Sequence, residues 1–204
     1  MATTETISPR YAGLDSWPDE TILAAFSDGQ DQAMAAVRDA HPAIATAARA
    51  IAQRSGERGR IIYVGAGSSG VIAALDGIEL GGTFGWPDDR VLFVLANGTT
   101  LQPGMPGGPE DDASRARNDL AAVSPTPADS VIAVAASGTT PFTLAAVIAA
   151  RTAGALTVGI ANNRPSPLLA EANVPIFLDT GPEIIVGSTS MNTGTAKKEA
   201  LNML

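Results

Sequence analysis

The segment RIIYVGAGSSG, residues 60–70, decides the fold. A short β-rich apolar run, Arg60 to Val64, leads directly into a glycine-rich turn. An uninterrupted apolar strand of this kind is typical of a parallel sheet that is buried on both faces. The residues that follow, Ser69 to Leu80, suit a helix, so the segment predicts the first strand–turn–helix unit of an α/β domain.

The same alternation continues through the rest of the chain. It predicts a parallel five-stranded sheet flanked by helices, with right-handed crossovers. The further expected strands are Val91–Ala96, Ser130–Ala135, Leu156–Ile160 and the weaker Val174–Leu178, and the further expected helices are Glu110–Ala122, Pro141–Ala153, Pro167–Ala172 and Met191–Leu204.

The first part of the chain has a different pattern, which predicts N-terminal helices. Thr21 to Phe26 indicates a short helix, and Gln30 to Gln53 a longer one with a break at Pro42. We therefore divide the chain into a helical segment, residues 1–57, and an α/β domain, residues 58–204. Two loops rich in glycine and proline, Gly81–Asp89 and Asn97–Pro109, look irregular, and such loops are often functional.

Composition excludes several classes of function. The 204 residues carry a net charge of −8, which argues against nucleic acid as a partner. The chain has no cysteine and a single histidine, His41, so we expect no disulfide and no metal site. Met1 to Arg10 lacks an apolar signal core and no apolar run is long enough to span a membrane, which indicates a cytoplasmic protein.

Three loops are rich in serine and threonine. Residues 65–70 and 136–141 each follow a strand and open a helix, and residues 187–190 precede the final helix. Helix capping explains any one of them, because serine and threonine are preferred N-cap residues. Together they favour a phosphate site, since ligands of open α/β sheets bind beyond the carboxyl ends of the strands. The candidate binding residues are Gly67, Ser68, Ser69, Ser137, Thr139, Thr140, Ser188, Thr189 and Ser190.

Residues 65–70 also match the G-x-G-x-x-G pattern of dinucleotide-binding domains. Such a site needs an acidic residue at the end of the next strand, where this chain has Ala96-Asn97-Gly98. The sequence therefore favours a sugar phosphate over a dinucleotide cofactor.

These motifs resemble the SIS (sugar isomerase) domain, and above all the N-acetylmuramic acid 6-phosphate etherases and the related glucokinase regulatory proteins. The resemblance implies a flavodoxin-like three-layer sandwich, and a helical region beyond Leu204 that this chain lacks. The matching residues are Thr4-Glu5, Leu14-Asp15, residues 65–70, Leu75-Asp76, Glu79, residues 83–85, 135–138, Thr140-Pro141, residues 181–183, 187–189, 194–196 and 201–203.

The similarity to the etherases implies a reaction on a phosphorylated amino sugar. The lactyl ether at C3 is cleaved by elimination followed by water addition, without a cofactor. Glu79 matches the proton donor of the family, and Glu110 matches its second catalytic glutamate, the expected base at C2. The same resemblance implies a homodimer with its sites near the subunit interface. We expect Glu183 to be structural, and Lys197 and Lys198 to form a helix face, although either lysine could reach an anion.

Four positions differ from the family pattern. Neutral residues stand where the family carries arginine or lysine: Val71, Thr139, Ser190 and Asn192. Neutral side chains do not replace the two-point fork with which arginine binds carboxylates and phosphates. The alternative to an etherase is therefore a regulatory sensor, a protein that binds a sugar phosphate and regulates a partner without catalysing a reaction. An aldose–ketose isomerase is the third hypothesis, but its histidine could only be His41, in the N-terminal helices.

Overall fold

A computed structural model of the chain describes residues 3–100 and 107–204, and in it the predicted parallel sheet is confirmed. The five strands lie in the order β2-β1-β3-β4-β5, and every neighbouring pair is parallel. Predicted strand boundaries differ from the observed ones by at most one residue. The strands are β1 (Ile61–Gly65), β2 (Val91–Leu95), β3 (Ser130–Val134), β4 (Leu156–Ala161) and β5 (Val174–Phe177).

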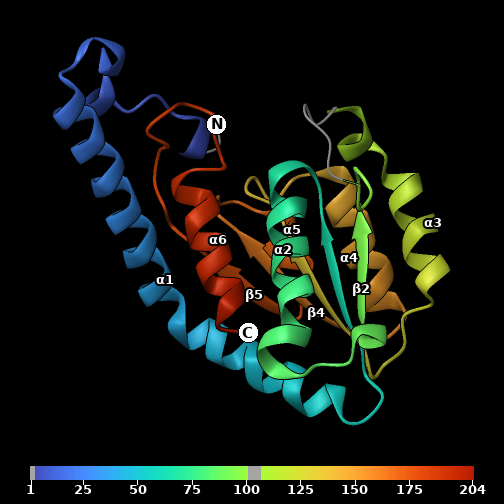
Figure 1. Cartoon of the computed structure of the whole chain (residues 1–204). Helices are drawn as coiled ribbons and strands as arrows, with labels where there is room; N and C mark the ends of the chain where they lie inside the picture. Colours follow the sequence, from blue (N-terminus) through green and yellow to red (C-terminus); the bar gives the residue numbers. More distant parts are fainter. Residues whose placement is uncertain (1–2, 101–106) are drawn as a thin grey trace.

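Helices cover both faces of the sheet, which gives the three-layer architecture (Figure 1). Alternate residues of each strand point to opposite faces, so Tyr63 packs in one core and Val64 in the other. One face is covered by α1 (Asp19–Ser55), α2 (Gly67–Phe84) and α6 (Asn192–Asn202), and the other by α3 (Ala113–Val123), α4 (Pro141–Thr152) and α5 (Pro167–Glu171).

The predicted break at Pro42 is wrong, because α1 is one helix that runs through this residue and through Gly29. Pro42 lies on the exposed side of α1, while Ala40 and Ile44 pack in the core on either side of it. A proline inside a helix costs about 3 kcal/mol. The continuous buried face of α1 offsets that cost, because packing supplies most of the stability of helices in proteins.

Other boundaries also shift. Helix α2 takes in Gly81 to Phe84, which were predicted as loop, and ends where Gly85 adopts a left-handed φ of 65°. The last helix ends at Asn202, although the sequence predicted that it runs to Leu204. The predicted loop 97–109 lies partly outside the described residues. Short 3-10 turns occupy Thr3–Glu5, Pro9–Tyr11, Leu14–Ser16, Asp88–Arg90 and Gly108–Asp111. None of the described helices is long and apolar enough to cross a membrane.

Two glycines of α2 should respond in opposite ways to alanine. A Cβ on Gly77 would lie 2.6 Å from Phe93, whereas a Cβ on Gly82 would meet nothing within 4 Å. Alanine favours a helix over glycine by about 1 kcal/mol, and overpacking a core costs about 1–3 kcal/mol. We therefore expect Gly82→Ala to raise the free energy of unfolding and Gly77→Ala to lower it, measured by urea denaturation. Equal effects would contradict the close packing of α2 on β2.

Candidate functional site

The hydroxyl-rich loops gather at the carboxyl edge of the sheet. The first follows β1 and the second follows β3, and these strands are neighbours that pair Gly65 with Val134. From β1 the chain crosses to β2 on one side, and from β3 to β4 on the other. Ligands of open α/β sheets bind at such a switch point. The predicted loops therefore flank the position where this fold binds its ligands.

The first loop is a tight turn into α2. Gly67 has a φ of 53°, and a Cβ on Gly65 would lie 2.8 Å from the Cα of Gly70. The Gly67 N–H donates to Asn97 Oδ1 at 3.2 Å. Asn97 stands where a dinucleotide site has its carboxylate, and here its side chain holds the glycine-rich turn. Ser68 is half-buried and Ser69 is buried. The glycine pattern thus serves the close approach of β1 and α2.

The second loop is closed by its own hydroxyl groups. Ser137 Oγ accepts hydrogen bonds from the N–H of Thr139 at 3.2 Å and from its hydroxyl at 3.0 Å. Ser137 and Thr140 are half-buried and Thr139 is exposed. No side-chain hydrogen bond caps α4, which begins at Pro141. The first N–H groups of α4 therefore remain available for an anion.

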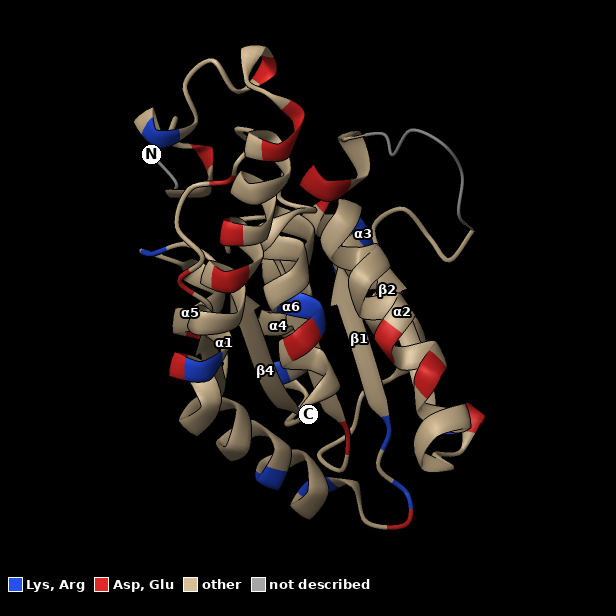
Figure 2. Ribbon diagram, turned by 60° about the vertical axis from the view of Figure 1, so that its left-hand side comes forward, with Lys and Arg blue, Asp and Glu red and all other residues tan. Residues whose placement is uncertain are grey.

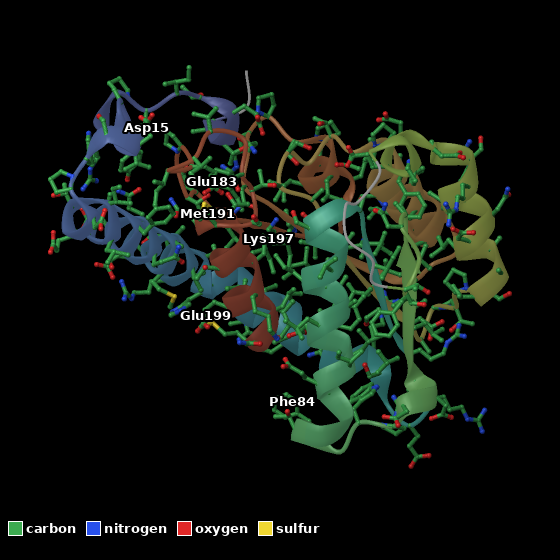
Figure 3. All side chains as sticks on the ribbon, turned by 45° about the horizontal axis from the view of Figure 1, so that its top comes forward. Asp15, Phe84, Glu183, Met191, Lys197 and Glu199 are labelled. Atoms are coloured by element: carbon green, nitrogen blue, oxygen red, sulfur yellow. The ribbon has the colours of Figure 1, made fainter. Side chains whose placement is uncertain are left out.

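The third loop is joined to the first by a buried lysine. Lys197 Nζ donates to Ser69 Oγ at 2.9 Å and to the carbonyl of Thr189 at 3.3 Å. The hydroxyls of Ser188 and Ser190 lie 3.4 Å apart at the outer side of this loop. In Figure 3 the Lys197 label lies between α6 and the first turn of α2.

Lys197 does not lie on an exposed helix face, so that interpretation is wrong for this residue. It is 0% exposed, and its ammonium reaches from α6 to Ser69 at the start of α2. Burial lowers the pKa of Lys197 to about 8, although the carboxylate of Glu183 acts in the opposite direction. An ammonium group is thus held beneath two of the three loops.

Glu183 has the structural environment that the sequence predicted. Its carboxylate is 1% exposed and accepts hydrogen bonds from the first N–H groups of α6, those of Asn192 and Thr193, both at 3.0 Å. A carboxylate at this end of a helix is favoured by the free N–H groups and the helix dipole. Glu183 therefore fixes the start of α6 and the loop before it.

The two candidate catalytic glutamates are not brought together within the chain. Glu110 lies at the loops, because its Oε2 atom would be 4.0 Å from a Cβ on Gly67. Glu79 lies about 18 Å further along α2, at 1.5 Å of helix rise per residue. It is exposed and forms an ion pair with Lys198 at 2.6 Å.

Lys198 links α6 to the middle of α2. It bonds Asp76 at 3.1 Å as well as Glu79, and Asp76 also accepts the hydroxyl hydrogen of Tyr63 at 2.7 Å. Burial alone would lower the pKa of Lys198, but the two carboxylates outweigh it and raise the pKa. Asp76, Glu79 and Tyr63 also line a cavity of about 650 Å³ between α1 and α2, well away from the loops.

Sequence reasoning missed the positions of Lys197 and Asp76 in the interior. Helical spacing contains the signal for Lys197, because Thr193, Lys197 and Ala200 recur at intervals of four and three residues and all are buried. Charged residues are rarely buried unless they are paired, so residue type alone predicts a surface position for both Lys197 and Asp76. Figure 2 shows the charged positions of both signs scattered over the ribbon of the described residues.

Comparisons with known proteins agree with this architecture. The SIS domain family profile matches residues 111–204. The chain is 47% identical over 201 residues to the N-acetylmuramic acid 6-phosphate etherase of Deinococcus radiodurans, with coverage of 98% of this chain and 66% of the relative. It is 36% identical over 204 residues to the etherase of Cutibacterium acnes, with coverage of 100% and 67%. The chain thus spans about two thirds of the length of these relatives.

Solved structures share the fold at low sequence identity. A phosphoheptose isomerase from Francisella tularensis superimposes with a TM-score of 0.64 and 20% identity, covering 92% of this chain and 94% of that chain. The Vibrio vulnificus NanR protein complexed with ManNAc-6P superimposes with a TM-score of 0.60 and 15% identity, covering 86% and 59%.

Loss of the Glu183 carboxylate should destabilise the fold. Glu183→Ala leaves two buried N–H groups at the start of α6 without an acceptor. An unsatisfied buried group costs about 1–3 kcal/mol, so we expect a loss of at least 2 kcal/mol in the free energy of unfolding, measured in urea. Glu199→Ala, on the half-exposed side of α6, is the matched control and should change stability by less than about 0.5 kcal/mol. An unchanged midpoint for Glu183→Ala would rule out the capping role.

Proposed function

The chain belongs to the N-acetylmuramic acid 6-phosphate etherase family of SIS-domain proteins, and we propose that it acts as a lyase on a phosphorylated amino sugar. The reaction would break the lactyl ether at C3 by elimination, and water would then add to the product. The observation that supports this proposal most is the meeting of the hydroxyl-rich loops at the switch point of the sheet, with Lys197 joining two of them. We also propose a cytoplasmic location, where sugar phosphates are retained.

In this proposal the phosphate group lies among residues 67–69, 137–140 and 188–190. These residues offer hydroxyl donors and the free N–H groups of a helix N-terminus, and both suit the oxygens of a phosphate. Glu110, beside Gly67, is the candidate base for the proton at C2. Its position close to the loops supports this role.

Glu79 is the candidate acid for the leaving oxygen. It cannot share a substrate with Glu110 in the same chain, because about 18 Å of helix separates Glu79 from Gly67. We propose that a homodimer supplies the second carboxyl group from the other copy. An exposed apolar stripe on α2 supports such an interface, since Val71, Leu75 and Ile78 are 36%, 43% and 66% exposed.

Which substrate the site accepts depends on the four neutral residues that stand where the family carries arginine or lysine: Val71, Thr139, Ser190 and Asn192. Asn192 is 0% exposed and its amide packs against Gly29, so it is not available to a ligand in this structure. Thr139 and Ser190 are exposed at their loops. We propose that the phosphate is bound as in the family, while the second anion of the substrate, the lactyl carboxylate, is bound without an arginine fork.

Release of lactate tests the proposed activity. We expect the purified protein to release lactate from N-acetylmuramic acid 6-phosphate, and Glu79→Gln and Glu110→Gln to lower the rate by at least about a hundredfold, the typical contribution of a positioned acid or base. Glu199→Gln serves as the control. If sugar phosphate binds but no lactate forms, the etherase assignment fails and the regulatory sensor is supported instead.

The oligomeric state tests the proposal that a second copy of the chain supplies Glu79 to the site. We expect a dimer by light scattering coupled to gel filtration, and a shift to monomer on Ile78→Glu, which places a charge on the exposed stripe of α2. The equally exposed Leu23 on α1, 66% exposed, provides the control Leu23→Glu, which should stay dimeric. A monomeric wild-type protein that still releases lactate would contradict the shared site.

A further inference from the structure

Lys197 is the one fully buried cation among the described residues, and its hydrogen bonds go to neutral groups rather than to a carboxylate. The ammonium has three N–H donors and no acceptor. Two donors go to Ser69 Oγ and to the carbonyl of Thr189, which are both neutral. The carboxylate of Glu183 acts on Lys197 through space, and its oxygens accept hydrogen bonds from the first N–H groups of α6.

The bond to Ser69 has a direction that follows from the chemistry of the two groups. A protonated lysine can only donate, so Ser69 Oγ must be the acceptor in this bond. The Ser69 hydroxyl hydrogen is then free to point elsewhere, since the bond that the structure shows for Ser69 Oγ, within residues 3–100 and 107–204, is the one it accepts from Lys197. Ser69 lies in the first turn of α2, beside the N–H groups of the glycine-rich loop. The hydroxyl hydrogen therefore remains available for an anion at this loop.

We propose that Lys197 is a positioning residue of the anion site: its ammonium fixes the Ser69 hydroxyl as a donor toward a phosphate and holds the first and third loops together, so that binding weakens when the lysine loses its proton. This inference rests on the proposed function and names a device that regulates that same site. Lys197 is 0% exposed and acts on the ligand through Ser69 and the loop of Thr189.

Burial lowers the pKa of Lys197 to about 8, into a mildly alkaline range, and the charges around it offset this only in part. From the loop before α6 the facing charge is Glu183. On α2 the nearby carboxylates are Asp76 and Glu79, which bind Lys198, the neighbouring cation of α6. On α1 the side facing this core consists of small aliphatic residues such as Ala33 and Val37. A neutral Lys197 would gain an acceptor lone pair, and the Ser69 hydroxyl could then turn inward.

Burial of Lys197 also makes the stability of the fold depend on pH. The pKa of Lys197 is about 8 in the folded chain, below its ordinary value of 10.5, so the folded state binds fewer protons between these values. Stability rises with pH wherever the unfolded state binds more protons. The cost of burying the charge is therefore present below about pH 8 and decreases toward pH 10.5. A neutral residue at 197 avoids this cost at pH 7.5 and gives up the bonds to Ser69 and Thr189.

Binding of N-acetylglucosamine 6-phosphate, measured by calorimetry from pH 7.5 to 9.5, tests the proposal. The phosphate stays dianionic over this range because its second pKa is near 6. We expect the Kd of the wild-type protein to rise about tenfold as Lys197 loses its proton, equivalent to one hydrogen bond. Lys197→Met should bind about tenfold more weakly at pH 7.5 and show no rise. Lys197→Gln, which keeps an N–H donor, should bind nearly as the wild type at pH 7.5 and also show no rise.

Arg49→Met, on the exposed side of α1, controls for the loss of one positive charge and should keep both the affinity and the pH profile of the wild type. Thermal melts of each variant at pH 7.5 establish that it is folded. If Lys197→Gln retains the wild-type rise in Kd, or Lys197→Met binds as the wild type does, the role of Lys197 is overturned while the proposed function stands. If the wild-type protein binds no sugar phosphate at any pH, the proposed function is overturned and this inference with it.

Discussion

All five strands run in the same direction, and this constraint determines where the chain can build a site. Each strand must return through a helix on one face of the sheet, so every strand ends at the same edge. The crossovers from β1 and β3 go to opposite sides, which opens the edge between them. Loops that are far apart in the sequence, at residues 65–70 and 136–141, are therefore neighbours because their strands are paired.

The third loop needs more than the sheet to hold it. It precedes α6 and has no strand beneath it, and buried charges fix it instead. Glu183 holds the start of α6 through two peptide N–H groups, and Lys197 ties the loop to Ser69. Charges are costly to bury unless hydrogen-bonded, and both groups are. The face of the sheet covered by α1, α2 and α6 thus contains the polar framework, while the apolar core on the other face combines alanine and branched aliphatic residues with Phe142.

The sequence was sufficient for the sheet and its loops, and insufficient for features that depend on packing. Apolar, β-rich runs predicted all five strands to within one residue. Pro42 was misjudged because its local preference against a helix is outweighed by the long buried face of α1, which only the fold reveals. Lys197 was placed on the surface because composition favours solvent for lysine, whereas α2 covers it. The predicted helix already placed Glu79 several turns beyond Gly67, but only the fold shows that Glu110 lies beside Gly67 and therefore far from Glu79.

One consequence concerns attachment chemistry rather than catalysis. The chain contains only two lysines, Lys197 and Lys198, and they are adjacent on α6. The first is enclosed, so among the lysines only Lys198 is open to reagents that acylate amines. Lys198 is the ion-pair partner of Glu79. Coupling this protein to a resin or a dye through its amines would therefore remove the counter-charge of the carboxylate proposed to act on the substrate, whereas an engineered cysteine, in a chain that has none, would leave that pair intact.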